Sequence, residues 1–183
     1  LALDYDVDVD IHVIKDFYVP KTLLRGSLLL AISYSGNTLE TINALKIGLN
    51  LNIPAAVVTS GGVLLELAER LKLPYVKVKA GLVPRVAMPH MLYAALILLD
   101  SLGLTVIPRS VLEKSLNAIK LDDEKLAKAS SIARFLYGSR IPLVVSSMRY
   151  SVLAVRLKNE LNENSKMPCK VEIAPELFHN DIV

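Results

Sequence analysis

The sequence predicts an α/β protein built on a doubly wound parallel sheet. Short apolar runs alternate along the chain with longer segments in which apolar residues recur at helical spacing. Several of these runs are continuously apolar, which is typical of strands that are covered by helices on both faces. The alternation of strands and helices favours right-handed crossovers and a parallel sheet. With 183 residues, of which 52% are hydrophobic, the chain can fill a sizeable core.

The N-terminal part of the chain supplies the first elements in order. Alternating apolar and polar residues predict a strand over residues 7–14, and a continuous apolar run predicts a buried strand over residues 28–32. A helix is expected to begin near Thr38, with Asn37 and Glu40 spaced three apart as in a capping box. The change of period after the second strand marks a strand-to-helix junction.

The next elements repeat this pattern and complete a first α/β unit. They are strand 55–58, a turn at Ser60-Gly61-Gly62, helix 64–71, strand 75–78, and a helix from about Pro89 to Leu102 with proline in its first turn.

The second half of the chain predicts a connector and the beginning of another α/β unit. Helical stretches begin at Ser110 and Asp122, and they are followed by strand 141–145, helix 152–161 and strand 169–173. The predicted division is residues 1–104, a helical connector over 105–140, and the start of a second unit over 141–183. Because the chain starts without Met and stops inside an apparently ordered segment, we expect it to be a fragment.

Composition argues against several classes of function. The 21 basic and 18 acidic residues leave a net charge of only +3, and the basic residues are scattered, which argues against a nucleic-acid partner. The apolar run 91–99 is too short to span a bilayer. Cys169 is alone, so it forms neither an intrachain disulfide nor a thiolate cage, and a cytoplasmic location is expected. The three His show no metal-ligand spacing, and no metal or cofactor is assigned.

Residues 33–38 form a candidate phosphate loop. The segment lies between a buried strand and a helix start, where open α/β sheets bind ligands. Ser33, Ser35 and Thr38 offer hydroxyl donors, Gly36 lets the backbone approach a ligand, and the new helix offers N–H groups. An ordinary turn with an Asn cap is the alternative. For Ser60-Gly61-Gly62 the turn interpretation is favoured over a ligand contact. Neither a dinucleotide-binding nor a Walker motif is present.

Three residues together offer the groups that a carbonyl isomerisation needs. Such a reaction uses a base that carries a proton between adjacent carbons, a donor near the ring oxygen, and a cation near the enediolate. Glu163, His179 and Arg85 are of these types, but their pattern in the sequence alone does not select them over surface roles.

Three segments carry a resemblance to a known family. They are residues 33–41 (SYSGNTLET), residues 83–85 (VPR) with Pro89, and residues 158–168 (KNELNENSKMP) with 174–180 (APELFHN). These segments resemble the phosphate loop, the Pro-Arg loop and the catalytic stretch of the sugar isomerase (SIS) domain proteins. Within that family they are similar to the archaeal-type bifunctional phosphoglucose/phosphomannose isomerases. The resemblance runs from about Val9 to Val183.

The resemblance implies a fold, a reaction and a set of site residues. It implies tandem flavodoxin-like SIS units, the second incomplete, in a homodimer whose active site lies at the interface. Glu163 would move the proton between C1 and C2, Arg85 would steady the cis-enediolate, and His179 would assist ring opening from the neighbouring subunit. Ser33, Ser35 and Thr38 would bind the phosphate of glucose 6-phosphate or mannose 6-phosphate.

Two segments of the family have no counterpart in this sequence, and two other functions stay open. The family carries a Gly-Gly-Ser-type loop on an earlier strand and a Lys near its C-terminus, and neither can be matched here. A non-catalytic SIS module that senses a sugar phosphate is one alternative, and an inactive truncated relative is the other. A sensor would need the Ser33 loop but not Glu163 or His179.

Overall fold

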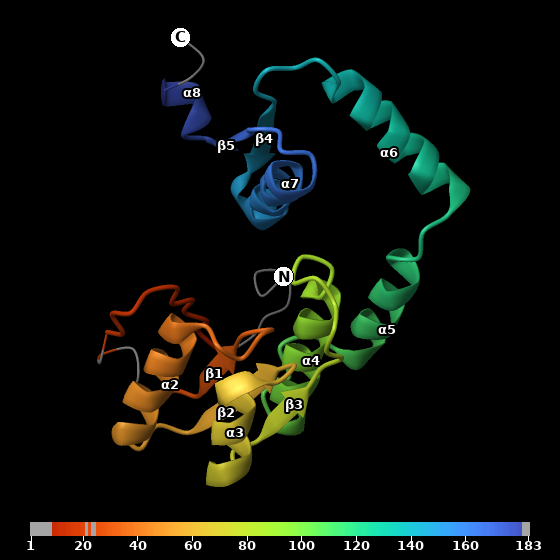
Figure 1. Ribbon diagram of the computed structural model, residues 1–183. Helices are drawn as coiled ribbons and strands as arrows, with labels where there is room; N and C mark the ends of the chain where they lie inside the picture. Colours follow the sequence, from red (N-terminus) through yellow and green to blue (C-terminus); the bar gives the residue numbers. More distant parts are fainter. Residues whose placement is uncertain (1–8, 21, 23–24, 181–183) are drawn as a thin grey trace. The chain divides into compact units, whose positions relative to one another are not determined.

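The computed structural model describes residues 9–20, 22 and 25–180 of the chain (Figure 1). The chain divides into two compact units, residues 1–119 and 120–183. Each unit contains its own parallel sheet. None of the described helices is long and apolar enough to cross a membrane.

The first unit is built on a three-stranded parallel sheet. Its strands β1 (Leu29–Ile32), β2 (Ala55–Thr59) and β3 (Tyr75–Lys77) follow one another in the order β1-β2-β3. All five residues of β2 are buried, because this strand has a neighbour on each side and helices on both faces. The predicted parallel arrangement and the three strand positions are therefore confirmed.

Helices cover both faces of this sheet, so the unit has three layers. Ala55 and Val57 of β2 share one core with α2 (Leu39–Asn50) and α3 (Gly62–Leu71). Ala56 and Val58, which point to the opposite face, share a second core with α4 (Met88–Ser101). The small alanines let α2, α3 and α4 approach the central strand closely, and the doubly wound arrangement follows from the chain crossing between the two faces.

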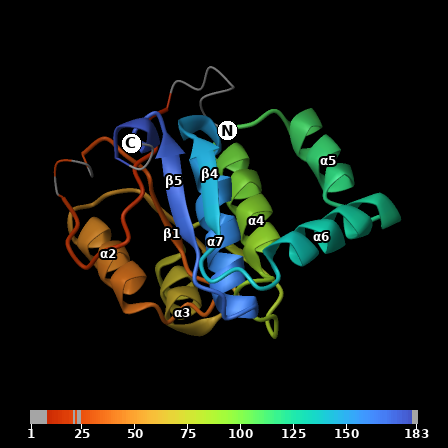
Figure 2. The same cartoon turned by 90° about the horizontal axis from the view of Figure 1, so that it is seen from above.

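The second unit contains a two-stranded parallel sheet. Its strands are β4 (Leu143–Ser147) and β5 (Lys170–Ala174), and Figure 2 shows their arrows pointing the same way. The short 3₁₀ helix η1 (Met148–Tyr150) leads from β4 into α7 (Ser151–Asn164), which packs against both strands, and α8 (Leu177–Asn180) follows β5. The order strand, helix, parallel strand is the expected one.

Two helices lie along the chain between α4 and β4. They are α5 (Arg109–Ala118) and α6 (Asp123–Leu136), and neither buries a residue. Asp122 caps α6 by accepting a hydrogen bond from the backbone N–H of Lys125 at 2.8 Å. The side chain of Lys125, and then its backbone N–H, hold the pKa of the Asp122 carboxyl below its usual value. The boundary between the two units falls between α5 and α6, and the finer division with a connector over 105–140 stays a prediction.

Two local predictions are wrong. Described residues 9–14 form no strand, and the side chain of Val13 is 74% exposed; residues 7 and 8 lie outside the described part. The alternation of apolar and polar residues predicts which side chains can pack together. A strand also needs hydrogen-bond partners for its backbone groups, and here a hollow lies between this segment and β1. The capping box is also absent, because Thr38 is the N-cap of α2 and Asn37 is used elsewhere.

Candidate functional site

Two turns meet at the carboxyl ends of β1 and β2. We call residues 33–38 the Ser33 loop and residues 60–62 the Ser60 turn. The carbonyl oxygen of Tyr34 accepts hydrogen bonds from the backbone N–H of Ser60 at 2.9 Å and from its hydroxyl at 2.7 Å. Adjacent parallel strands place both turns at the same edge of the sheet, so the Ser60 turn supports the Ser33 loop.

The first turn of α3 completes this support. The Asn37 side-chain oxygen accepts from the N–H of Val63 at 3.1 Å, and the Gly36 carbonyl accepts from the N–H of Leu64 at 3.0 Å. These two N–H groups lie in the first turn of a helix, where no acceptor within the helix is available. Asn37 therefore caps the neighbouring helix α3 and not α2, which explains why the sequence spacing was misleading.

Two glycines allow the loops to interlock. Gly36 has a φ of +68°, and a Cβ built on it would lie 1.8 Å from the carbonyl oxygen of Gly61. Gly62 also has a φ of +68°, and its Cβ would lie 2.4 Å from the carbonyl oxygen of Ser35. Both the left-handed backbone and the close approach exclude a side chain at these positions. The Ser33 loop and the Ser60 turn therefore form one rigid structure.

The three predicted phosphate ligands lie in this loop, and two of them touch. Ser33 Oγ and Thr38 Oγ1 are 2.7 Å apart, and Ser33 Oγ also accepts from the N–H of Gly36 at 3.2 Å. Each hydroxyl has one hydrogen to donate, and the shared bond uses one of the two. Whichever residue donates, one hydroxyl hydrogen of the pair remains for a ligand.

Ser35 adds a third hydroxyl, which lies on the exposed side of the loop. Its oxygen accepts from the N–H of Asn37 at 3.2 Å, a bond that does not use the hydroxyl hydrogen. The N–H groups in the first turn of α2, which begins directly after Thr38, also have no acceptor within the helix. The loop thus offers uncharged hydroxyl and N–H donors, which together can bind an anion.

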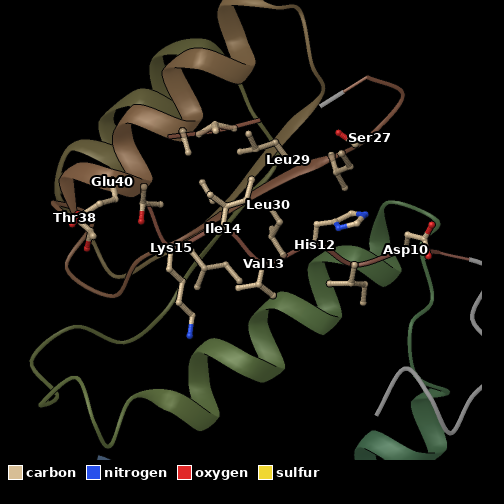
Figure 3. A pocket seen from close by; sticks show the side chains of 17 residues that line it. Asp10, His12, Val13, Ile14, Lys15, Ser27, Leu29, Leu30, Thr38 and Glu40 are labelled. Carbon is tan, nitrogen blue, oxygen red and sulfur yellow. The ribbon is translucent and has the colours of Figure 1, made fainter. Parts of the chain in front are cut away.

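A hollow of about 610 Å³ reaches the end of this loop (Figure 3). It lies between residues 10–15 and β1, and apolar side chains make up most of its walls. Figure 3 shows Thr38 and Glu40 at one end and Asp10 and His12 at the other. Thr38 is the residue of the Ser33 loop that lines the hollow, and the Glu40 carboxylate lies beside it, so the hollow adjoins the loop without containing its serines.

Arg85 lies in the same unit as the Ser33 loop. It is half-buried and sits on a turn in which the N–H of Val86 bonds the carbonyl of Val83 at 3.0 Å. The segment before this turn is bonded to Tyr34, whose hydroxyl accepts from the N–H of Leu82 at 2.7 Å and donates to the carbonyl of Lys79 at 3.0 Å. These two hydrogen bonds therefore link the segment that leads to Arg85 with the Ser33 loop.

Glu163 and His179 both belong to the second unit. Glu163 is exposed in the last turn of α7, and its carbonyl accepts from the Lys166 ammonium at 2.7 Å. His179 is exposed in α8. A second carboxylate on α7, that of Glu160, is engaged by Arg156 and by the Asn164 amide. Glu160 therefore has a structural role on the helix, and the two units carry separate parts of the predicted residue set.

Sequence reasoning missed which residues support the loop, although it placed Ser60 in a turn. Tyr34, Thr59 and Ser60 hold its shape, and Thr59 is fully buried with its hydroxyl donating to the carbonyl of Gly61 at 2.9 Å. A tyrosine between two serines in a polar loop is the one available signal, because an aromatic ring there indicates a buried contact. Among the described residues, no cluster of three or more His, Cys, Asp or Glu side chains is suited to hold a metal.

Comparisons with known proteins agree in both sequence and fold. Residues 125–183 match the family model "Bacterial phospho-glucose isomerase C-terminal SIS domain". A bifunctional phosphoglucose/phosphomannose isomerase from Aeropyrum pernix is 41% identical over 95% of this chain. One from Aquifex aeolicus is 34% identical over 93% of this chain. In both cases the match covers 52% of the relative's length. A D-glucosamine-6-phosphate 4-epimerase from Sulfolobus acidocaldarius is 32% identical over 97% of the chain, with 56% of the epimerase covered. The chain thus spans about half the length of these curated relatives.

Solved structures show the same fold. A hypothetical protein from Thermus thermophilus aligns with a TM-score of 0.66 at 19% identity, covering 88% of this chain and 46% of that one. A candidate phosphosugar isomerase from Clostridium difficile aligns with a TM-score of 0.60 at 18% identity, covering 88% of this chain and 50% of that one. The solved structures support the fold, and the sequence matches show that the chain belongs to the SIS-domain family that includes the bifunctional phosphoglucose/phosphomannose isomerases.

Proposed function

We propose that this chain carries the sugar-phosphate site of an aldose-ketose isomerase that interconverts glucose 6-phosphate, and also mannose 6-phosphate, with fructose 6-phosphate without a cofactor. One observation carries the proposal. The Ser33 loop is rigid, lies at the carboxyl ends of two parallel strands and presents uncharged donors, in a chain whose relatives are named phosphoglucose/phosphomannose isomerases. Uncharged donors at a helix N-terminus are suited to a reversibly bound phosphate monoester, which supports the proposal.

Ser33, Ser35 and Thr38 bind the phosphate in this proposal. The rigid loop aims the free hydroxyl hydrogens before the ligand arrives, so little ordering accompanies binding. Because none of the three side chains is charged, the phosphate is held by hydrogen bonds and by the N-terminal end of α2, without an ion pair to these residues. The sugar then extends from this fixed end.

Glu163, Arg85 and His179 carry the chemistry. In the open-chain aldose, the Glu163 carboxylate takes the proton from C2 and returns it to C1, through a cis-enediolate. The Arg85 guanidinium stabilises the developing negative charge on the enediolate oxygens. His179 of a neighbouring subunit assists the opening of the sugar ring, so the proposal includes a homodimer with the site at its interface. The enzyme is proposed to act in the cytoplasm.

The direct test is hydrogen exchange at C2 of glucose 6-phosphate in deuterated water, followed by NMR. A proton that resides on a carboxylate exchanges with solvent, so the chain is expected to place deuterium at C2 faster than buffer alone. Sorbitol 6-phosphate, which keeps the phosphate but has no carbonyl, should compete. Binding of glucose 6-phosphate with no exchange would favour a sugar-phosphate sensor, and exchange at C4 alone would point to epimerase chemistry.

Thr38→Val tests the phosphate loop. The substitution removes one hydroxyl of the Ser33–Thr38 pair and keeps the side-chain volume, so glucose 6-phosphate should bind about 10-fold to 100-fold more weakly, as expected for a hydrogen bond to a charged group. Calorimetry measures the affinity. Thr105→Val is the control, because the Thr105 hydroxyl bonds the Asp100 carboxylate at 2.6 Å and lies outside the loop. Equal affinities in both variants would remove Thr38 from the site.

A further inference from the structure

Tyr34 is the only residue of the Ser33 loop for which the described hydrogen bonds reach both neighbouring loops. Its carbonyl accepts from the N–H and the hydroxyl of Ser60, at 2.9 Å and 2.7 Å. Its phenol hydroxyl accepts from the N–H of Leu82 at 2.7 Å and donates to the carbonyl of Lys79 at 3.0 Å. The backbone of Tyr34 is thus hydrogen-bonded to Ser60, directly after β2. Its side chain is hydrogen-bonded to Lys79 and Leu82, which lie 45 and 48 positions further along the chain.

The ring of Tyr34 cannot easily move away from this position. It packs against the core that Ala56 and Val58 share with α4, and Val78, directly after β3, belongs to the same core. A phenol that is held by packing along its ring and by two hydrogen bonds at its tip has few alternative rotamers. Tyr34 therefore holds residues 79–82 in a fixed position relative to the sheet.

The segment that Tyr34 holds leads directly to Arg85. Residues 83–87 fold back on themselves, with the N–H of Ala87 bonding the carbonyl of Pro84 at 3.2 Å, and Ala87 is fully buried. The turn with Arg85 is thus anchored on one side by Tyr34 through Leu82, and on the other by Ala87 at the start of α4. The distance from the Ser33 loop to Arg85 is set by these two anchors.

We propose that Tyr34 is a positioning residue that sets the turn carrying Arg85 relative to the phosphate loop. The inference rests on the proposed function, because Arg85 and the phosphate are its two ends. Tyr34 itself touches neither the phosphate nor the reacting carbons. Its hydroxyl acts through Leu82 and Lys79.

Tyr34→Phe separates this role from folding, since it keeps the ring and removes only the hydroxyl. Backbone hydrogen exchange by mass spectrometry reads the 79–87 segment without any turnover, and calorimetry with sorbitol 6-phosphate as the probe reads the phosphate loop. The Leu82 N–H should exchange about fivefold faster in the variant, the factor that corresponds to one typical net hydrogen bond. Exchange in the turn over residues 83–86 should rise with it, because the Leu82 hydrogen bond anchors one side of that turn.

Two further readouts distinguish positioning from a general loss of structure. The affinity for the probe should stay within about threefold, because Ser33, Ser35 and Thr38 are unchanged, whereas the rate of deuterium incorporation at C2 should fall about 10-fold or more, as for a misplaced catalytic group. Tyr93→Phe is the matched control, because the Tyr93 hydroxyl pairs with Ser115 Oγ at 2.6 Å in the same unit, and this bond involves no residue of the segment 79–85. It should change none of these readouts.

The outcomes separate the positioning role from the isomerase proposal. Unchanged exchange at Leu82 in Tyr34→Phe, or an unchanged rate of deuterium incorporation at C2 in that variant, would overturn the positioning role. A wild-type chain that does not bind the probe would overturn the phosphate site and the inference that rests on it. If exchange at Leu82 rises in the variant but no deuterium enters C2 in the wild-type chain, then Tyr34 holds the segment and the isomerase proposal fails.

Discussion

Replacement of Glu163 by Gln is expected to reduce deuterium incorporation at C2 of glucose 6-phosphate by about 10²-fold to 10⁴-fold, the usual contribution of a general base. Glutamine keeps the size and the hydrogen-bonding shape of the side chain, but its amide cannot take up a proton at neutral pH. Because Glu163 is exposed in the last turn of α7, the change should leave thermal unfolding nearly unaltered. NMR of the sugar and a thermal melt measure the two effects.

Glu160→Gln provides the matched control on the same helix. The carboxylate of Glu160 is engaged by Arg156 and by the Asn164 amide, at the surface of α7. A surface ion pair contributes little, about 0–1 kcal/mol, so this variant should lose a small amount of stability and keep its exchange rate. If both variants lost exchange equally, the loss would reflect disturbance of α7, and Glu163 would no longer be the base.

Gly36→Ala is expected to cause the largest loss of stability of any single change in the loop, about 2–5 kcal/mol from left-handed backbone strain plus overpacking. The added Cβ would lie 1.8 Å from the carbonyl oxygen of Gly61, so the Ser33 loop and the Ser60 turn must separate. Separation also moves Ser33 and Thr38, and binding of glucose 6-phosphate should disappear. Urea unfolding followed by circular dichroism gives the stability, and calorimetry gives the binding.

Comparison with Gly26→Ala isolates the part of this loss that comes from the close approach of the two turns. Gly26 has a φ of +69°, nearly the same as Gly36, but a Cβ there would meet no atom within 4 Å. Its cost should therefore be the backbone strain alone, about 1–2 kcal/mol. A Gly36→Ala variant that is no less stable than Gly26→Ala would show that the two turns are not interlocked in solution.

The alternation of strands and helices could be predicted because it depends on local periodicity. The run 28–32 and the strand 55–58 were placed correctly, since a continuous apolar run covered on both faces has few other structures available. Residues 9–14 show the limit of this reasoning. Their alternating pattern is compatible with a strand, but pairing depends on where a partner lies in space, and the pattern carries no such information.

The location of the candidate site could also be predicted from the sequence, whereas the contacts that support its loop could not. A loop between a buried strand and a helix start indicates a ligand site from topology alone, and Ser33 and Thr38 do meet there. That Asn37 caps α3 and that Tyr34 reaches Leu82 are contacts between segments 26 and 48 positions apart. No spacing in the sequence reveals them. The roles of Arg85, Glu163 and His179 stay predictions from family resemblance.

The uncharged donors of the Ser33 loop have a consequence for how binding responds to acidity. Neither a serine or threonine hydroxyl nor a backbone N–H titrates near neutral pH, whereas a phosphate monoester gains its second charge with a pKa of about 6. The loop's own donors are therefore the same below and above that value, and only the ligand changes. If the loop binds a sugar phosphate as proposed, its contribution to the pH dependence of affinity therefore reports the ionisation of the ligand, because none of its donors changes charge near neutral pH.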